Sequence, residues 1–255
     1  MTPEIPGPVD IKAQLRTPHF LPKVAELETA FTFIGDRKRC TNDWVDFLVK
    51  EGVYEFPTEE YIDGLGAHLM GRVEELSGTP EQPVRILEVA AGKGKLSYFL
   101  QKKLEEEIPG KSLIIATDNL SWSSSSTTTA RSLHVESLSY KEALEKHKPH
   151  IVIGSWIPSD GGGDTAEDWS VAFRQTPTVQ EYILIGDPNH HATERAFGIQ
   201  RDDWYKPPSS DFVPEYQQDG FEKVELTHLN PLQFGYMDRA PGMHSSRTIT
   251  FRRQK

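Results

Sequence analysis

The sequence predicts an α/β fold: a doubly wound, mostly parallel sheet with an antiparallel hairpin at its C-terminal edge and a helical extension at its N-terminus. Two observations predict it. After residue 83, short apolar runs alternate with amphipathic segments, the order typical of parallel strands joined by crossover helices. Near the C-terminus, two β-rich segments are separated by a loop rather than a helix, which favours an antiparallel pair.

The segment before the sheet is expected to be an extended arm followed by helices. Its first thirty residues are rich in proline and contain one short helix near 24–30. Thr41 or Asn42 can cap a helix that runs to Lys50, and Thr58 can cap a second helix. An apolar stripe at helical spacing continues this second helix, made of Ile62, Leu65, Leu69, Val73 and Leu76.

The sheet region is expected to contain five core strands, two edge strands and two helices. We divide the chain into an arm and helical cap over residues 1–80 and a sheet domain over residues 81–255. The strands are predicted at 85–90, 112–118, 132–136, 150–156, 181–187, 220–229 and 247–253, and the helices at 95–108 and 141–148.

Composition narrows the function classes. The net charge of −10 argues against a nucleic-acid partner, because tracking a phosphate backbone needs clustered Lys and Arg. The one compact basic run, 37–39, is expected to be a solvated patch. A single cysteine, Cys40, suits a reducing compartment. Without a signal-peptide pattern or a long apolar run, we expect no membrane span and a cytoplasmic location, with the nucleus left open.

The most informative segment is RILEVAAGKGKLSYFL, which places Glu88 near the end of a buried strand, before Gly92 and Gly94. Ligands of open α/β sheets bind beyond the carboxyl ends of the strands, where glycines let the backbone approach them closely. A phosphate-binding P-loop would need Ser or Thr where Leu96 stands. The dinucleotide fingerprint would need a third glycine where Ser97 stands. Neither phosphate motif is present.

An acidic residue followed by spaced glycines resembles the first motif of class I S-adenosylmethionine-dependent methyltransferases, with Ala90 in place of the first glycine. The resemblance covers roughly residues 83–255 and implies S-adenosylmethionine as cofactor. It implies that Asp118 accepts hydrogen bonds from the ribose hydroxyls, although a helix-cap role is an alternative. The implied cofactor-binding residues are Glu88, Ala90, Gly92, Gly94, Asp118, Asn119, Ser137, Leu138 and Ser155.

Residues after the fourth and fifth strands are candidates for the acceptor side: Trp156, Asp160 and His190. Each also has a structural interpretation. Trp156 can be a packing aromatic, Asp160 a turn residue, and His190 a histidine flanking a helix. Because methyl transfer can be accelerated by positioning alone, no catalytic residue is assigned. His190 and His191 are adjacent and therefore do not share a helix face, so we expect no metal-binding site.

The helical cap carries aromatic side chains that look exposed. They can shape an acceptor pocket, as in many enzymes of this resemblance, or form a structural cap on the sheet. These residues are Trp44, Phe47, Tyr54, Phe56 and Tyr61.

These observations predict methyl transfer to a small organic molecule. Two alternatives remain open at this stage. A protein methyltransferase could use the acidic surface to attract a basic partner. A non-catalytic binding or scaffold module would keep the fold without turnover, an alternative supported by Ala90 and by the Ser/Thr-rich stretch 121–130. A nicotinamide-dependent reductase is disfavoured because the third glycine is missing.

Overall fold

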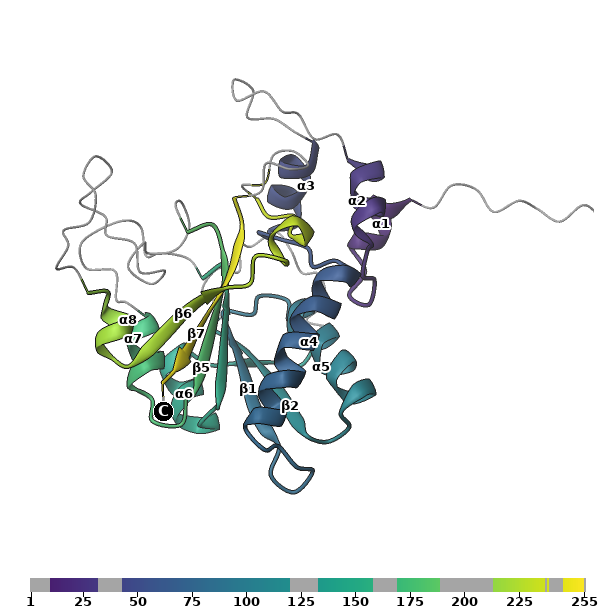
Figure 1. The fold of residues 1–255 in the computed structure, drawn as a ribbon. Helices are drawn as coiled ribbons and strands as arrows, with labels where there is room; N and C mark the ends of the chain where they lie inside the picture. The colour runs from purple at the N-terminus through teal and green to yellow at the C-terminus, as the bar shows by residue number, and fades with distance from the viewer. Residues whose placement is uncertain are drawn as a thin grey trace, which may run out of the picture.

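The structure is a computed structural model of the chain, and it describes residues 10–31, 43–119, 133–157, 169–188, 213–236, 238 and 245–254. In this part of the chain, one sheet forms the centre of the molecule (Figure 1), with the strand order β3-β2-β1-β4-β5-β7-β6. The strands are β1 (Val84–Val89), β2 (Ser112–Asp118), β3 (Val135–Ser137), β4 (Ile151–Ser155), β5 (Glu181–Gly186), β6 (Phe221–Glu225) and β7 (Arg247–Arg253).

The pairing confirms the predicted fold class. Strands β1 to β5 pair in parallel, whereas β7 pairs antiparallel with both β5 and β6. The chain reverses its strand order at β1, since β2 and β4 lie on its two sides. Val89, near the end of β1, is in register with Thr117 of β2 and Gly154 of β4. The carboxyl ends of these three strands therefore lie together at one end of the sheet, and ligands of such sheets bind at this end.

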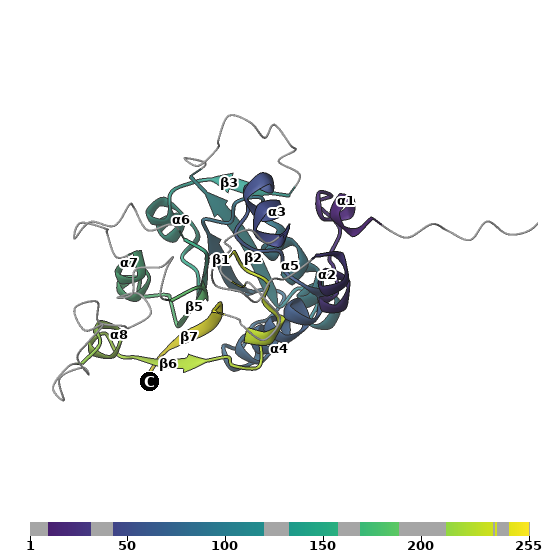
Figure 2. The same ribbon diagram turned by 90° about the horizontal axis from the view of Figure 1, so that it is seen from above.

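Helices cover both faces of the sheet. Viewed from above in Figure 2, α4 and α5 lie on one side and α6 and α7 on the other. The bounds are α1 (Ile11–Leu15), α2 (Val24–Ala30), α3 (Asp43–Glu51), α4 (Glu59–Glu75), α5 (Lys95–Glu107), α6 (Tyr140–His147), α7 (Trp169–Gln175) and α8 (Glu215–Gln218).

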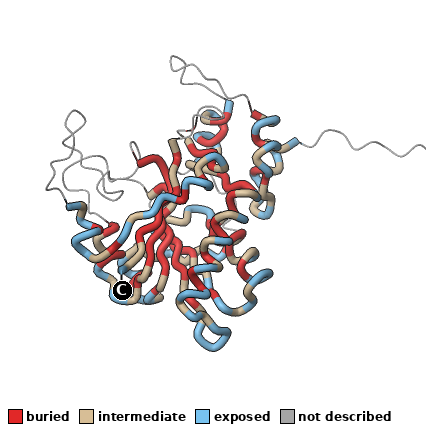
Figure 3. Tube along the Cα trace, in the orientation of Figure 1, coloured by how far each residue is buried: buried red, intermediate tan, exposed pale blue. Residues whose placement is uncertain are grey.

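The apolar core consists of two layers separated by the sheet. Because successive side chains of a strand point to opposite faces, β1 contributes to both. Val84 and Ile86 pack with α4 and α5, whereas Leu87 and Val89 pack with α6 and α7. Figure 3 shows this burial as a continuous band along the central strands. The sheet is thus covered on both faces, which explains why β1, β4 and β5 are runs of apolar residues.

The N-terminal helices enclose a third apolar cluster of their own. Figure 1 shows α1, α2 and α3 grouped at one end of the sheet. Their cluster is completed by a residue from near the C-terminus, Phe234. The expectation that the cap aromatics are exposed is wrong for four of the five, since Trp44, Phe47, Phe56 and Tyr61 are buried. Trp44, Phe47 and Phe56 pack against one another and against Phe31, whereas Tyr61 packs in the core layer of α4 and α5. The local sequence pattern does not reveal these partners.

Most predicted elements are found, with corrections at the edges. Strand β2 and helix α2 have the predicted bounds, and Thr58 caps α4 by accepting a hydrogen bond from the Tyr61 amide. The third strand begins at Val135 rather than at residue 132. Helices α1, α7 and α8 were not predicted, because each has only 4 to 7 residues, too few for a clear apolar period.

Candidate functional site

Glu88 connects the end of β1 to the first turn of α5. Its Oε2 accepts hydrogen bonds from the Ser97 amide at 3.1 Å and from the Ser97 hydroxyl at 2.5 Å. Gly94, the residue before α5, has no side chain with which to cap the helix, so Glu88 satisfies one of the helix's first amides instead. Burial raises the pKa of Glu88 to about 7, against the opposing effect of its bonds to Ser97. The acidic position of the motif thus holds the turn and the helix together.

The turn after β1 uses left-handed backbone conformations at three positions. Ala90, Gly92 and Gly94 have φ angles of 53°, 54° and 73°. A non-glycine residue rarely adopts this conformation, so Ala90 is a strained substitute where the motif has glycine. The turn is tied down by two backbone bonds, from the Ala91 amide to the Thr117 carbonyl at 3.0 Å and from the Gly94 amide to the Ala91 carbonyl at 2.8 Å.

The two glycines of this turn face different surroundings. A Cβ atom at Gly94 would come within 2.6 Å of Val135 Cγ2, so this glycine lets the turn pack closely on β3. A Cβ atom at Gly92 would meet no atom within 4 Å. Gly92 is also exposed, so its backbone borders open space at the carboxyl end of β1. This is the arrangement expected where a ligand approaches the backbone.

Asp118, at the end of β2, lies beside this open backbone. Its Oδ2 accepts a hydrogen bond from the Gly92 amide at 2.9 Å. The helix-cap alternative for Asp118 concerns residues after Asn119, which lie outside the described part of the chain. Ser137 of β3 is in register with Asp118, and the Leu138 amide donates to the Asp118 carbonyl at 3.2 Å. The predicted residues of strands β1, β2 and β3 are therefore neighbours in space.

Two lysines of the turn contact the N-terminal cap. Lys93 Nζ donates to the Glu51 carbonyl at 3.1 Å, and Lys95 Nζ lies 3.3 Å from the carbonyls of both Leu15 and Thr17. The Lys95 ammonium also lies 4.9 Å from the centre of the Phe56 ring. Burial lowers the pKa of Lys95 to about 8. Both lysines thus hold the cap against the turn.

Trp156 follows Ser155 directly after β4, at the same edge of the sheet. It also has a left-handed backbone, with φ of 50°, and its amide donates to the Ile185 carbonyl at 2.8 Å. Its indole is buried and stacks on Tyr54 with the ring centres 5.8 Å apart. The packing interpretation of Trp156 is therefore supported, and the ring joins the cap to the strand end.

The hydrogen-bond partner of the Trp156 indole N–H is a residue that no sequence motif indicates. It donates to Glu55 Oε2 at 2.5 Å, and Gln233 Nε2 lies 3.4 Å from Glu55 Oε1. Burial of its carboxyl group, with a smaller effect from the nearby carboxylate of Asp238, raises the pKa of Glu55 to about 8 against the opposing hydrogen bonds from Trp156 and Gln233. A lone acidic residue in the aromatic segment VYEFP was the only signal in the sequence, and it belongs to no motif.

The other acceptor-side candidates lie outside the described residues, namely Asp160 and His190. Asp187, just after β5, is described and fully buried. Among the described side chains, no group of three or more His, Cys, Asp or Glu residues could hold a metal ion. None of the described helices combines the length and apolar composition that a membrane span requires.

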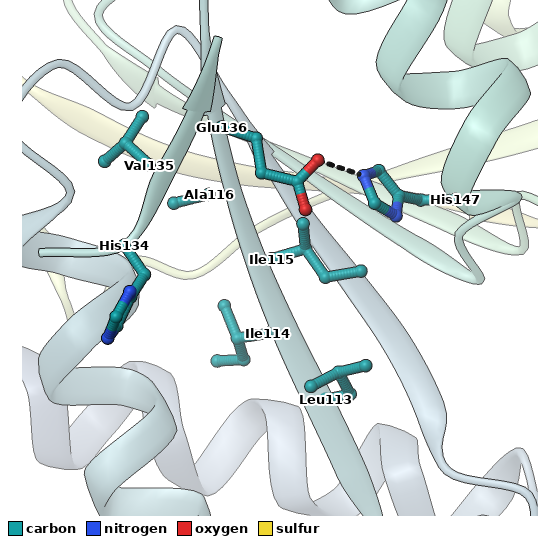
Figure 4. Close-up of a pocket in the computed structure, with 8 residues that line it drawn as sticks. All are labelled: Leu113, Ile114, Ile115, Ala116, His134, Val135, Glu136 and His147. Carbon is teal, nitrogen blue, oxygen red and sulfur yellow. Dashed lines mark hydrogen bonds and ion pairs between the residues drawn. The ribbon is translucent and has the colours of Figure 1, made fainter. Parts of the chain in front are cut away.

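A groove lies along the lateral edge of the sheet, beside β2 and β3. It is open and has a volume of about 510 Å³. Figure 4 shows His147 bonded to Glu136, with apolar side chains of β2 beside them. Strand β3 pairs only with the last three residues of β2, which leaves the start of β2 uncovered. The groove is lined by Leu113, Ile114, Ile115, Ala116, His134, Val135, Glu136 and His147.

No protein-family model and no curated protein matches the chain. Among solved structures it is similar to the CurJ carbon methyltransferase, at 16% identity and a TM-score of 0.35 over 68% of this chain and 49% of that one. It is also similar to a Listeria monocytogenes protein proposed to be an S-adenosylmethionine-dependent methyltransferase, at 15% identity and a TM-score of 0.36 over 68% and 92% of the two chains. A third is the methyltransferase (CMeT) domain of the citrinin polyketide synthase, at 16% identity and a TM-score of 0.36 over 70% and 48%.

The chain spans about half the length of the CurJ and citrinin synthase structures. At this level of similarity the neighbours say nothing about ligand or substrate, which have to be inferred from the site residues.

Proposed function

We propose that the protein is an S-adenosylmethionine-dependent methyltransferase that acts on a small organic molecule. The observation that carries the proposal is the exposed backbone of Gly92, which borders open space and touches the carboxylate of Asp118. The ribose of the cofactor has two hydroxyl donors, which a carboxylate can accept, and it needs backbone beside it that carries no side chain. Asp118 and Gly92 provide these two features side by side. The residues present therefore fit the cofactor.

Each of the turn residues would contribute differently to binding. Asp118 offers two acceptor oxygens to the ribose hydroxyls, and Leu138 lies beside it for an apolar contact with the adenine. The N-terminus of α5 carries partial positive charge, which suits the carboxylate of the methionine part. Glu88 holds the turn without needing to touch the ligand, since its Oε2 is already bonded to Ser97.

The cofactor supplies a methyl group on a positively charged sulfur. The chain would have to orient an acceptor in line with that group and exclude water, because most of the acceleration can come from positioning. The cap is held over the turn by Lys93 and Lys95, and Tyr54 stacks on Trp156 at the end of β4. Because the site is covered in this way, we expect the methyl acceptor to be a small molecule rather than a residue on the surface of another protein.

Two measurements test this proposal. A thermal-shift screen should show stabilisation by S-adenosylmethionine and S-adenosylhomocysteine but not by nicotinamide cofactors. Methyl-labelled S-adenosylmethionine, incubated with the protein and a fractionated lysate, should then label the low-molecular-weight fraction. Label in the protein fraction would instead favour a protein substrate. Stabilisation without any transfer would favour a non-catalytic binding module.

A further inference from the structure

Glu55 is an acidic residue held in a fixed position at the edge of the sheet where the site lies. Its Oε2 receives the Trp156 indole N–H at 2.5 Å, and its backbone bridges to that of Gly235. The Trp156 ring is itself confined, because a Cβ atom at Gly235 would come within 2.3 Å of it. These contacts join three separate parts of the chain around one carboxyl group.

The position of Glu55 follows from the residues on either side of it. Phe56 lies against the ammonium of Lys95, at the start of α5 directly after the glycine turn. Tyr54 stacks on Trp156, directly after β4. Strands β1 and β4 are adjacent and in register at their carboxyl ends, so the segment 54–56 reaches both strand ends, with Glu55 bonded to Trp156 on the β4 side. This is the side on which an acceptor would meet the cofactor.

Glu55 has no positively charged partner in the part of the chain that the structure describes. No Lys or Arg among the described residues forms an ion pair with it, unlike Glu181 at the opposite end of β5. The titratable groups facing it are the carboxylate of Asp238 and the phenol of Tyr61 on α4. Two more phenols, those of Tyr54 and Tyr236, flank the same segment. Among the described residues, this half-buried carboxyl group receives side-chain hydrogen bonds only from neutral donors, an arrangement that costs stability and is typical of functional sites.

Resting on the proposed function, we propose that Glu55 is the proton acceptor for methyl transfer, so that the acceptor substrate brings a proton on its reacting oxygen, nitrogen or carbon atom. The acceptor atom forms a bond to the methyl carbon while its proton passes to the Glu55 carboxylate. The carbon–sulfur bond breaks, and its electron pair remains on sulfur, which becomes neutral. Charge and atoms balance without another reactant.

The ionisation of Glu55 sets the pH at which it can act. With a pKa of about 8, its carboxylate form increases as the pH rises through that value. The Trp156 hydrogen bond opposes this shift, because a donor stabilises the charged form. Trp156 is thus a positioning residue that keeps Glu55 ionised at a lower pH than burial alone would allow.

The test compares wild type with Glu55→Gln and Trp156→Phe. Binding of S-adenosylmethionine is measured by calorimetry, and transfer of labelled methyl into the low-molecular-weight lysate fraction is measured from pH 6.5 to 9. Glu55→Gln should bind the cofactor like wild type but transfer about 100-fold less or worse, without the wild-type rise in rate near pH 8. Trp156→Phe should shift that rise to higher pH.

A second measurement needs no acceptor. Because folding raises the pKa of Glu55, wild type should lose stability as the pH rises from about 4.5 to about 8, and Glu55→Gln should lose less, with Glu88 accounting for part of the remainder. A matched control is Glu59→Gln, a half-exposed residue in the first turn of α4, which should behave like wild type in every assay.

The outcomes separate the two proposals. If wild type binds the cofactor and transfers methyl, but Glu55→Gln does so equally with the same pH profile, the role of Glu55 is refuted and the proposed function stands. If wild type neither binds the cofactor nor transfers methyl, both proposals are refuted. If Glu55→Gln does not fold, the pH shift of Trp156→Phe decides, and its absence contradicts the role of Glu55.

Discussion

A Cβ atom added at Gly92 would point into open space, whereas one added at Gly94 would meet Val135 Cγ2 at 2.6 Å. Both positions have a positive φ, so alanine at either one costs about 1–2 kcal/mol of backbone strain. Gly94→Ala should cost roughly 1–3 kcal/mol more through overpacking against β3. Gly92→Ala should instead weaken cofactor binding. Urea unfolding and calorimetric titration of both variants measure the two effects, and equal losses of affinity would contradict the assignment.

At the residue scale, the cofactor side of the site could be predicted because its signals are local. Glu88, Gly92 and Gly94 lie within seven consecutive residues, and Asp118 ends a strand that is obvious from its apolar run. The acceptor side is different. Glu55 and Trp156 are far apart in the sequence, and only the tertiary packing of the cap brings them together. Periodicity carries no signal for such a contact.

At the scale of helices and strands, Lys95 connects the N-terminal cap to the start of α5, directly after the glycine turn. Replacing it with methionine removes two hydrogen bonds, one to the last residue of α1 and one to Thr17 after it, while keeping an apolar side chain against Phe56. In Lys95→Met, amide hydrogen exchange in residues 11–18 should be faster by about 5- to 30-fold, for a local loss of about 1–2 kcal/mol.

Lys102→Met is the matched control for this change. Lys102 lies on the same helix with its side chain 62% exposed, and its ion pair with Glu106 at 4.0 Å contributes little. Exchange in residues 11–18 should be unchanged in Lys102→Met. Equal exchange in wild type and Lys95→Met would show that this lysine does not hold the cap.

Element length decided which helices could be predicted. Helix α4 has 17 residues, an apolar stripe and a Thr58 cap, and all three signals appear in its sequence. Helix α1 has 5 residues between prolines, and its Asp10 cap alone does not distinguish it from a turn.

The division of the chain at residue 80 stays a prediction. Helix α4, which falls on the cap side of that boundary, packs in the same apolar cluster as α5 and the sheet.

At the scale of the whole molecule, a buried cluster around Glu181 joins α4 to β5 and β7. Burial alone would raise the pKa of Glu181, but the hydrogen bonds and charges of its partners lower it below the ordinary value. His68 Nε2 lies 2.7 Å from Oε1, and Arg72 and Thr250 donate to the same carboxylate. The cluster lies at the opposite end of β5 from Gly186, so it is expected to act on stability alone.

A carboxyl group with a lowered folded pKa contributes stability above its unfolded pKa and loses it as the pH falls. Wild type should therefore lose stability as the pH drops below about 4.5. Glu181→Gln should cost about 3 kcal/mol at pH 7, because Arg72 stays buried with less compensation. The variant should also show a weaker acid dependence. Urea unfolding at pH 7 and pH 4 measures both. An unchanged difference between the two pH values would contradict this role.

The central claim is that the chain binds S-adenosylmethionine at the turn beside Asp118, and one calorimetric experiment tests it most directly. Wild-type protein should bind S-adenosylmethionine and S-adenosylhomocysteine with 1:1 stoichiometry. Asp118→Ala should bind about 30- to 1,000-fold more weakly, from the loss of two charge-assisted hydrogen bonds, while Asp118→Asn should be milder. No heat from folded wild type, or a loss of stability in Asp118→Ala with unchanged affinity, would contradict the claim.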